Sequence, residues 1–328
     1  MAVRSRVPFL VLTYPFPGGA ASLCEGRARV KILRRGAVLS EERLAAALKK
    51  ADGAVTLPSD PVSARVLESC PRLRVVANCA VGTDNVDLAA AARLGIAVTN
   101  TPDVLTEATA DLAWALILGV ARRVGEGDRM VRRGRFKGWA PDLLLGMDLR
   151  GRTLGIVGMG RIGKAVARRA PAFGMRVVYT DVRRLGESSE AALGARPLPL
   201  DELLAAADVV SLHCPLTEGN RHLLNRDRLT AMKLGAILVN TGRGPLVDEA
   251  ALVECLRAGH LAGAGLDVYE QEPALAPGLA DCPNTLLLPH VGSAGAETRA
   301  AMARTAVAEA LAVLEGRPPA HPVAPPAG

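Results

Sequence analysis

Short apolar runs alternate with alanine-rich amphipathic stretches along almost the whole chain. The apolar runs are nearly continuous, as expected of strands that are buried on both faces of a parallel sheet. They lie at 8–13, 54–56, 75–77, 154–157, 176–179, 208–212, 236–239 and 285–288. Helical spacing is found between them, at 39–50, 161–173, 201–207 and 248–258. This alternation predicts an α/β fold with doubly wound parallel sheets.

The alternation is present on both sides of residue 100, in a chain of 328 residues. That length is large for a single hydrophobic core. A polar, proline-containing break at 99–103 precedes a long helical pattern at 106–123, and a second long pattern covers 296–315. We therefore expect two similar α/β domains, although no close sequence repeat is visible.

The net charge of +7 does not predict a nucleic-acid-binding protein. The basic residues are scattered as pairs, and aromatic residues suited to base stacking make up only 3% of the chain. Solvated helix faces with some attraction for anionic ligands explain the charge better. The arginine pairs are Arg34/Arg35, Arg122/Arg123, Arg132/Arg133, Arg168/Arg169 and Arg183/Arg184.

Neither the cysteines nor the apolar segments suggest a zinc site, a redox dithiol or a membrane span. The six cysteines form no C-x-x-C pair, so neither a zinc site nor a redox dithiol is expected. The residues at 1–6 are followed by a strand-like run at 8–13 that is too short and too poorly flanked for a secretory signal, and the apolar stretch at 113–121 cannot cross a bilayer. A cytoplasmic protein without membrane contact is the default expectation.

A glycine-rich segment, Gly158-Met159-Gly160-Arg161-Ile162-Gly163, follows one predicted strand and opens one predicted helix. Glycines at this spacing permit a tight turn, close approach of the backbone to a pyrophosphate and close packing of helix on strand. The helix N-terminus then offers unpaired N–H groups to the phosphates. Asp181 ends the next strand, eighteen residues past Gly163, where an acid can bind the ribose hydroxyls. The segment therefore predicts a dinucleotide site.

Asp181 favours NAD, because a carboxylate would repel the 2′-phosphate of NADP. Arg183 and Arg184 follow directly and could bind that phosphate, so NADP stays possible.

Four further motifs stand in order around this segment. They are Val81-Gly82-Thr83-Asp84-Asn85-Val86-Asp87, Asn240-Thr241-Gly242-Arg243-Gly244, Asp267-Val268-Tyr269-Glu270-Gln271-Glu272-Pro273 and Pro289-His290-Val291-Gly292-Ser293. With them, the chain resembles the D-isomer-specific 2-hydroxyacid dehydrogenase family over nearly its whole length. Within that family, the segments 101–107 and 136–141 are most similar to the glyoxylate and hydroxypyruvate reductases.

The resemblance implies two domains with different tasks. A Rossmann dinucleotide-binding domain would cover 103–290, inserted into a flavodoxin-like substrate domain formed by 1–102 and 291–328. The active site would lie in the cleft between them, where domain closure can exclude water.

Reduction of a 2-keto acid needs a cation for the carboxylate and an acid for the carbonyl oxygen. Arg243 suits the first task, since a planar guanidinium matches a carboxylate. His290 is the candidate acid, with Glu272 as the carboxylate that favours its protonated form. Glu270 is a rival carboxylate and His213 a rival acid. The resemblance assigns Glu272 and His290 to catalysis and His213 to the cofactor side.

The resemblance also implies binding roles for other positions. The backbone N–H groups of Val81 and Gly82 would hold the substrate carboxylate, with Leu57 lining the same pocket. Besides the glycine segment and Asp181, the positions on the cofactor side are Thr109, His213, Pro215, Thr217, Thr241, Gly242, Asp267 and Gly292.

Both tryptophans suggest a two-fold homodimer. Trp139 would reach from a partner subunit into the substrate pocket of its neighbour, which is again an implication of the resemblance; simple packing against the loop at Pro141 is the alternative. Trp114 lies among Leu, Ile and Ala on the helical pattern at 106–123, a face apolar enough to bury in a dimer.

These features predict an oxidoreductase that reduces glyoxylate or hydroxypyruvate to D-2-hydroxy acids by hydride transfer from NAD(P)H. A 3-phosphoglycerate dehydrogenase would need a cation near Val81 and Gly82, but no Lys or Arg occurs between Val75 and Ala92. A phosphite dehydrogenase and an NAD(H)-sensing, corepressor-like binding protein stay open. Gly242 departs from the small residue, Ala or Ser, that the family commonly has there, and it adds backbone freedom beside Arg243. Cys79 and Thr83 stand where bulkier aromatic residues are often found, which leaves the size of the substrate pocket undecided.

Overall fold

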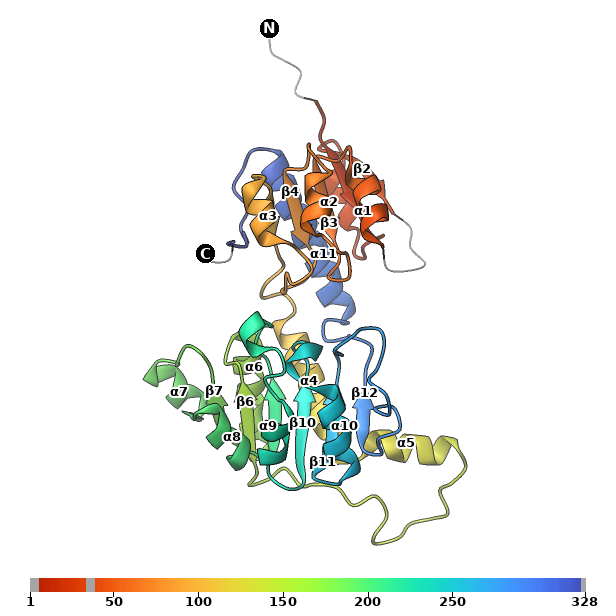
Figure 1. Ribbon diagram of the computed structural model, residues 1–328, viewed down its shortest axis with the longest axis vertical. Coiled ribbons are helices and arrows are strands. Elements are labelled where there is room, and N and C mark those ends of the chain that lie inside the picture. Colours follow the sequence, from red (N-terminus) through yellow and green to blue (C-terminus); the bar gives the residue numbers. More distant parts are fainter. Residues whose placement is uncertain (1–5, 34–38, 326–328) are drawn as a thin grey trace. The chain divides into compact units, whose positions relative to one another are not determined.

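The computed structural model of the protein describes residues 6–33 and 39–325 (Figure 1). The residues at 1–5, which begin the segment considered as a signal, and the pair Arg34/Arg35 lie outside the described residues. The chain divides into two compact units. Unit 1 comprises 1–105 and 293–328, and unit 2 comprises 106–292.

Unit 1 is built on a parallel sheet of five strands in the order β2-β1-β3-β4-β5. The strands are β1 (Phe9–Leu12), β2 (Arg29–Ile32), β3 (Gly53–Thr56), β4 (Val75–Asn78) and β5 (Ala97–Thr99). This order is the flavodoxin-like one. The three predicted strands of this unit are present, and β2 and β5 are additional.

Helices cover both faces of this sheet. One face carries α1 (Glu41–Leu48), α2 (Ala64–Glu68) and α3 (Leu88–Arg93), whose apolar side chains share one core with β1, β3 and β4. The other face carries α11 (Ala296–Leu314), which packs on β3, β4 and β5 and on a short 3-10 helix, η1 (Ala20–Cys24). The second face of the sheet of unit 1 is thus covered by α11, which comes from the C-terminal part of the chain.

Unit 2 is built on a parallel sheet of seven strands in the order β12-β11-β10-β9-β6-β7-β8. They are β6 (Thr153–Val157), β7 (Arg176–Thr180), β8 (Ala195–Pro197), β9 (Val209–Leu212), β10 (Ala236–Asn240), β11 (Leu261–Leu266) and β12 (Thr285–Leu287). This is the Rossmann order with one more strand at an edge. The order reverses between β6 and β9, and ligands of such sheets bind at the carboxyl ends of strands at this point.

The helices of unit 2 also form two layers. One contains α4 (Thr106–Ala121) and α6 (Arg161–Arg169), the other α8 (Leu200–Ala206), α9 (Arg226–Ala231) and α10 (Glu249–Arg257). On β10, Ile237 and Val239 join the first layer's core, whereas Leu238 joins the second. Burial on both faces explains the continuous apolar runs, and the predicted fold class is confirmed.

One expectation about α4 is wrong. The face that carries Trp114 is covered within the chain itself, because the indole stacks on Phe173 with ring centroids 4.3 Å apart. Its Nε1 donates to the carbonyl of Val166 at 3.1 Å, and the side chain is only 4% exposed. An apolar face that already packs on α6 and the sheet has nothing left to bury in a dimer, so this helix face is core.

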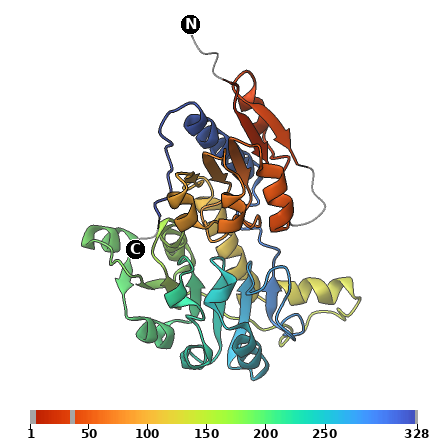
Figure 2. The same ribbon diagram turned by 45° about the horizontal axis from the view of Figure 1, so that its top comes forward.

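The predicted helix at 106–123 also ends earlier. Arg123 has a φ of 52°, and a separate helix, α5 (Val124–Arg132), follows it. Every residue of α5 is at least partly exposed. In both ribbon views α5 projects outward beyond β12, the edge strand of the sheet of unit 2 (Figures 1 and 2). Trp139, in the segment after α5, is 85% exposed, so it does not pack against the Pro141 loop.

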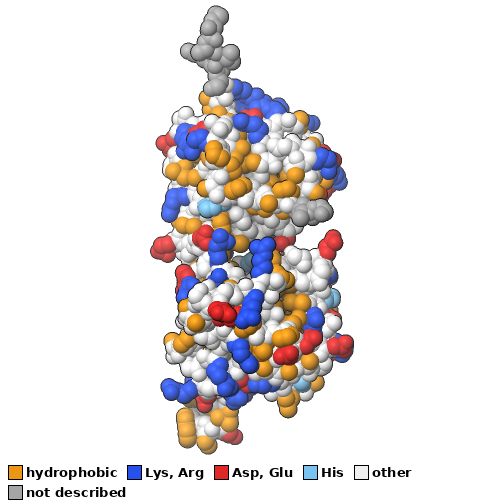
Figure 3. Space-filling view, turned by 90° about the vertical axis from the view of Figure 1, so that its left-hand side faces the viewer, with side chains coloured by type: hydrophobic (Ala, Val, Ile, Leu, Met, Phe, Trp, Pro, Cys, Tyr) orange, Lys and Arg blue, Asp and Glu red, His pale blue; other side chains and the backbone are white. Residues whose placement is uncertain are grey.

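The surface carries mixed charge. On the face drawn in Figure 3, basic and acidic side chains are interspersed over each unit, without one continuous basic stripe. Among the described residues, no helix is both long enough and apolar enough to span a membrane.

Candidate active site

The glycine segment lies directly after β6, at the point where the strand order of unit 2 reverses. Gly158 has a φ of 94°, and a Cβ there would collide with the backbone of Cys214, so a side chain is excluded. Gly160 precedes the first turn of α6, and a Cβ there would meet nothing within 4 Å. The open space lies where a pyrophosphate would approach the N-terminus of α6. Arg161 and Ile162 start that helix.

Asp181 lies at the end of β7 and is joined to this segment. Its Oδ2 accepts a hydrogen bond from the N–H of Met159 at 2.6 Å, and its Oδ1 accepts from the N–H of Arg183 at 2.9 Å. The guanidinium of Arg184 is paired with Glu190 at 3.0 Å. Arg183 is exposed and makes no side-chain hydrogen bond in the described part of the chain. Of the two arginines next to Asp181, the guanidinium of Arg184 is therefore engaged in an ion pair, whereas that of Arg183 is available to a ligand.

His213 follows β9, beside the end of β10. Its Nε2 lies 2.8 Å from Ser211 Oγ, and its Nδ1 lies 3.3 Å from Thr241 Oγ1. Burial lowers the pKa of His213 to about 4. The imidazole is therefore neutral near pH 7 and lacks the additional proton of an imidazolium, which argues against His213 as the general acid. Pro215 and Thr217 are tied together by Asn220, which bonds to the carbonyl of the first and the N–H of the second.

Three other positions expected on the cofactor side form one cluster. The buried carboxylate of Asp267 accepts the N–H groups of Val291 and Gly292, each at 2.7 Å. Thr109 Oγ1 donates to the carbonyl of Gly292 at 3.2 Å. Burial raises the pKa of Asp267, although both N–H groups act in the opposite direction. Asp267 thereby fixes the segment that follows His290.

Arg243 lies in the turn after β10, and Asn240 holds that turn from both sides. Asn240 Oδ1 accepts the N–H of Gly242 at 3.0 Å, and its Nδ2 donates to the carbonyl of Arg243 at 2.8 Å. Asn240 is buried at the last position of β10. The extra backbone freedom that Gly242 brings is therefore constrained by a neighbouring side chain.

His290 and Glu272 are in contact. Nδ1 of His290 lies 2.9 Å from Oε2 of Glu272, whose Oε1 accepts the N–H of Tyr269 at 3.1 Å. The rival carboxylate, Glu270, is occupied elsewhere, by Arg221 at 2.6 Å and by His222 at 2.7 Å. The structure therefore pairs His290 with Glu272 and not with Glu270.

The electrostatics of this pair favour an ionised carboxylate. Burial opposes ionisation of Glu272, but the hydrogen bond and charge of His290, the N–H of Tyr269 and the charge of Arg243 together lower its pKa below the usual value. His290 has a φ of 52°, a conformation that non-glycine residues seldom adopt and that often marks functional positions. Arg243, Glu272 and His290 thus form one electrostatic group in unit 2.

The predicted substrate loops of unit 1 are linked by a network of buried and partly buried polar side chains. Asn78, at the end of β4, donates to the carbonyl of Gly82 at 2.9 Å and to Asn85 Oδ1 at 3.0 Å. Asn85 in turn donates to the carbonyl of Leu57 at 3.0 Å, and the N–H of Leu57 donates to the buried carboxylate of Asp60 at 2.8 Å. One network therefore holds Leu57 and Gly82 together.

Asn100 performs a similar task for Val81, donating to its carbonyl at 2.8 Å. The carbonyls of both Val81 and Gly82 are thus engaged by side-chain amides, whereas their N–H groups make no hydrogen bond to described residues. Peptide groups arranged in this way are ready to donate to a carboxylate. Cys79 is buried, and burial raises the pKa of its thiol to about 12, so it does not present a reactive group beside this loop.

Sequence reasoning missed the residues that hold these loops: Asn78, Asp60, Asn100 and Asn240. Each is a polar residue at or just beyond the end of an apolar run, and each directs its side chain to a loop backbone. A buried polar group must find a hydrogen-bond partner. A polar residue near the end of a strand was thus the available signal. The sequence does not show, however, to which backbone group its side chain bonds.

Comparison with known proteins agrees with this geometry. Residues 114–292 match the family model described as D-isomer specific 2-hydroxyacid dehydrogenase, NAD binding domain. A glyoxylate reductase of Korarchaeum cryptofilum is 48% identical over 316 residues, 95% of this chain and 94% of the relative. The chain belongs to the D-isomer-specific 2-hydroxyacid dehydrogenase family. The resemblance inferred from the four motifs is confirmed.

Solved structures of D-2-hydroxyacid dehydrogenases and related proteins have the same fold. A protein of Thermus thermophilus matches with a TM-score of 0.90 and 52% identity, covering 96% of this chain and 99% of that one. An NADPH-dependent glyoxylate/hydroxypyruvate reductase of Sinorhizobium meliloti, solved in complex with NADP and malonate, matches with a TM-score of 0.85 and 35% identity, covering 97% of each chain.

Proposed function

We propose that this member of the D-2-hydroxyacid dehydrogenase family reduces glyoxylate and hydroxypyruvate to the corresponding D-2-hydroxy acids with NADH or NADPH. The observation that carries the proposal is the grouping of Arg243, Glu272 and His290 in the unit that also contains the glycine segment. The names of the relatives, which include glyoxylate and glyoxylate/hydroxypyruvate reductases, support the choice of substrate.

The residues of unit 2 fit a dinucleotide. The N-terminus of α6 and the open space at Gly160 would receive the pyrophosphate, and Asp181 would bind the ribose hydroxyls. His213, Thr241 and the cluster around Asp267 would line the side nearer the nicotinamide. The bound nicotinamide supplies the hydride that goes to the carbonyl carbon of the substrate.

Arg243 binds the substrate carboxylate and polarises the keto oxygen, since its planar guanidinium can donate two parallel hydrogen bonds. Asn240 keeps the backbone of that arginine in place. The N–H groups of Val81 and Gly82 donate to the same carboxylate, and Leu57 contacts the remainder of a small substrate. A cation and two N–H groups on one carboxylate orient the carbonyl for hydride transfer.

His290 gives its proton to the keto oxygen as the hydride reaches the carbon. Nδ1 bonds to Glu272, so Nε2 is the nitrogen left to face the substrate. The carboxylate of Glu272 holds the imidazole in the orientation from which Nε2 can deliver a proton. One hydride and one proton are consumed for each keto acid, and the product is the 2-hydroxy acid.

The assignment of tasks to the two units follows from these roles. Unit 2 is the dinucleotide-binding domain and also carries the acid and the arginine, whereas unit 1 binds the substrate through its loops. A homodimer is the assembly we propose, because α5 and the segment after it expose Val124, Val131, Phe136, Trp139 and Leu145. In that dimer, Trp139 would contact the substrate pocket of the partner subunit. The proposed location is the cytoplasm.

The decisive experiment is a panel of glyoxylate, hydroxypyruvate, pyruvate and phosphohydroxypyruvate, each assayed with NADH and with NADPH. Arg243→Ala should lower kcat/KM for glyoxylate by about two to three orders of magnitude, because the substrate carboxylate loses its cation. Arg226→Ala is the matched control, because this exposed arginine at the start of α9 already pairs with Glu254 on α10. Activity of Arg243→Ala at the wild-type level would remove the proposal.

The same panel separates the alternative functions. A 3-phosphoglycerate dehydrogenase would prefer phosphohydroxypyruvate, and a phosphite dehydrogenase would reduce none of the four. A corepressor-like binding protein would hold NADH but turn over these acids poorly. The contact between His290 and Glu272 favours proton transfer, and therefore turnover, over binding alone.

A further inference from the structure

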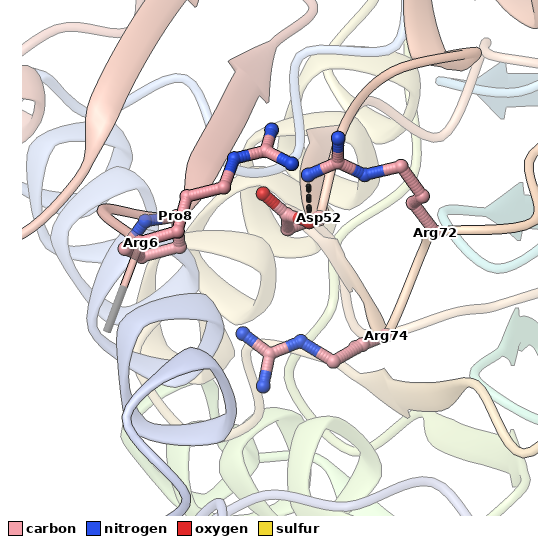
Figure 4. A pocket seen from close by; sticks show the side chains of 5 residues that line it. All are labelled: Arg6, Pro8, Asp52, Arg72 and Arg74. Atoms are coloured by element: carbon pink, nitrogen blue, oxygen red, sulfur yellow. Dashed lines mark hydrogen bonds and ion pairs between the residues drawn. The ribbon is translucent and has the colours of Figure 1, made fainter. Parts of the chain in front are cut away.

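Unit 1 contains a pocket of about 320 Å³ that none of the proposed roles uses. Arg6, Pro8, Asp52, Arg72 and Arg74 line it (Figure 4). They come from the segments that enter three neighbouring strands: the first two precede β1, Asp52 directly precedes β3, and Arg72 and Arg74 precede β4. The pocket is therefore at the amino ends of these strands, whereas Leu57, Val81 and Gly82 follow their carboxyl ends.

Of the described residues that line the pocket, only Asp52 carries a carboxylate, and its oxygens are already engaged. Oδ1 pairs with Arg72 Nη2 at 2.6 Å, and Oδ2 accepts the N–H of Phe9 at 2.7 Å. Burial opposes ionisation of Asp52, but these two bonds and the charges of Arg72 and Arg6 lower its pKa below the usual value. Asp52 is thus a fixed negative charge that holds Arg72 toward the pocket.

The other two guanidiniums have spare donors. Arg74 Nη2 donates to the carbonyl of Leu314, the last residue of α11, at 3.0 Å, which leaves its other N–H groups for a ligand. Arg6 makes no hydrogen bond to any described residue, and its guanidinium points to the same space (Figure 4). Three permanent cations therefore surround one carboxylate, an excess of positive charge that a small anion would balance.

We propose that this pocket binds a small phosphate-class anion, such as inorganic phosphate, pyrophosphate or a phosphorylated metabolite, with Arg6, Arg72 and Arg74 as its ligands. A guanidinium presents several N–H groups in one plane and matches the oxygens of a phosphate. A tetrahedral anion with two or more negative charges can accept from three directions at once, whereas a single carboxylate offers two oxygens in one plane. The volume of the pocket is large enough for a small ligand such as pyrophosphate.

An anion bound in this pocket would link the segments that precede β1, β3 and β4. A ligand that binds only the native state stabilises it, and the stabilisation grows with the logarithm of the ligand concentration once that concentration exceeds Kd. Because the pocket is at the opposite ends of the strands from the predicted substrate loops, the anion should not compete with a keto acid.

Isothermal titration calorimetry with pyrophosphate tests the proposal. The protein is first saturated with NADH, so that the glycine segment is not available to the probe, and the titration is run in about 0.15 M NaCl to screen weak surface attraction. Wild type should bind one pyrophosphate per chain at the pocket. Arg6→Gln/Arg74→Gln should weaken that binding at least about tenfold, equivalent to about 1.4 kcal/mol.

The matched control is Arg43→Gln/Arg65→Gln, which removes the same charge from exposed positions on α1 and α2. It should bind pyrophosphate as wild type does. Arg6→Gln alone guards against misfolding, because that side chain has no hydrogen-bond partner among the described residues to lose, and it should weaken binding several-fold.

Three results would overturn the proposal. They are absence of binding to wild type at millimolar pyrophosphate, equal binding by wild type and Arg6→Gln/Arg74→Gln, and tighter binding of citrate than of pyrophosphate, which would indicate a carboxylate site. If NADH itself fails to bind, the proposed dehydrogenase function fails, but the difference between the two double variants still reports on the pocket.

Discussion

Nδ1 of His290 and Oε2 of Glu272 lie 2.9 Å apart, although eighteen residues separate them in the sequence. Two backbone contacts support this arrangement: the N–H of His290 donates to the carbonyl of Asp267 at 2.9 Å, and the N–H of Tyr269 donates to Glu272 at 3.1 Å. The segment after β11 and the segment after β12 are therefore held together at the pair. If the pair transfers a proton, each partner should leave its own kinetic signature.

His290→Gln should lower kcat for glyoxylate reduction by about two to four orders of magnitude, because the general acid is lost. Glu272→Gln should lower it less, since the imidazole remains. Without the negative charge, however, the descending limb of the kcat/KM profile should move to lower pH, because the protonated imidazole is less stabilised. Profiles from about pH 5 to 10 measure both effects.

In the wild-type protein, lowering the pH should protonate Glu272 and so weaken its interaction with His290. The pKa of Glu272 is lowered in the folded protein, so the carboxylate stays ionised at neutral pH, and its stabilising effect is lost only as the pH falls through that lowered value. His260→Gln, at a histidine bonded to the Met232 carbonyl, is the control and should leave the profile unchanged. A profile of Glu272→Gln identical to that of wild type would contradict the proposed pairing in catalysis.

Asn78→Ala should raise KM for glyoxylate more than it lowers kcat, because Asn78 positions Gly82 and touches no reacting atom. The substitution also leaves a buried Thr56 hydroxyl without its acceptor, at a cost of about 1–3 kcal/mol in the free energy of unfolding. Steady-state kinetics and urea unfolding measure the two effects separately. A loss confined to kcat, with KM unchanged, would argue against a positioning role.

The choice between NADH and NADPH should depend on one of two adjacent arginines. Arg183→Ala should lower kcat/KM with NADPH several-fold and leave NADH unaffected, because its side chain is exposed and unpaired in the described residues. Arg184→Ala is the matched control, since Glu190 already engages that guanidinium. Asp181→Ala should relax the discrimination against NADPH. Wild type that uses NADPH far better than NADH would contradict the assignment of Asp181.

The two tryptophans should respond in opposite ways to truncation. Trp114→Ala removes a buried indole stacked on Phe173 and should lower the free energy of unfolding by about 3–5 kcal/mol. Trp139→Ala changes an 85% exposed side chain, so the fold should be unaffected, whereas KM should rise if the partner subunit uses it. Thermal unfolding, analytical ultracentrifugation and kinetics distinguish these outcomes. Unchanged KM and an unchanged dimer would remove the proposed role of Trp139.

The sequence was sufficient to predict the strands that are buried on both faces, because their side chains must be continuously apolar. It was not sufficient for β11, where Leu261–Leu266 contains two glycines, a residue that weakens a strand signal. The structure gives the reason for them. A Cβ on Gly265 would lie 2.9 Å from Cβ of Leu116, and one on Gly263 would press on Val120, so α4 needs both glycines in order to pack.

The candidate site was predictable to the extent that its motifs resemble a family. Arg243, Glu272 and His290 were chosen in this way, with Glu272 preferred over Glu270, and the contacts of both carboxylates support that preference. The supporting amides of Asn78 and Asn240 could not be predicted, because their partners are backbone groups of turns whose course the sequence does not encode locally. The apolar face of Trp114 was misread because helical periodicity cannot tell a core from an interface.

The engagement of Val81 and Gly82 by Asn100 and Asn78 has an evolutionary consequence. If the N–H groups of Val81 and Gly82 bind the substrate carboxylate as we propose, recognition relies on peptide groups whose carbonyls are held by side-chain amides, and the side chain of residue 81 takes no part in those bonds. Substitutions at residue 81 can therefore change which 2-keto acids are accepted while the N–H groups that bind their shared carboxylate stay in place. A single protein of this kind is well placed to acquire new substrates through one codon, and saturation mutagenesis of residue 81 is the natural starting point for redirecting it.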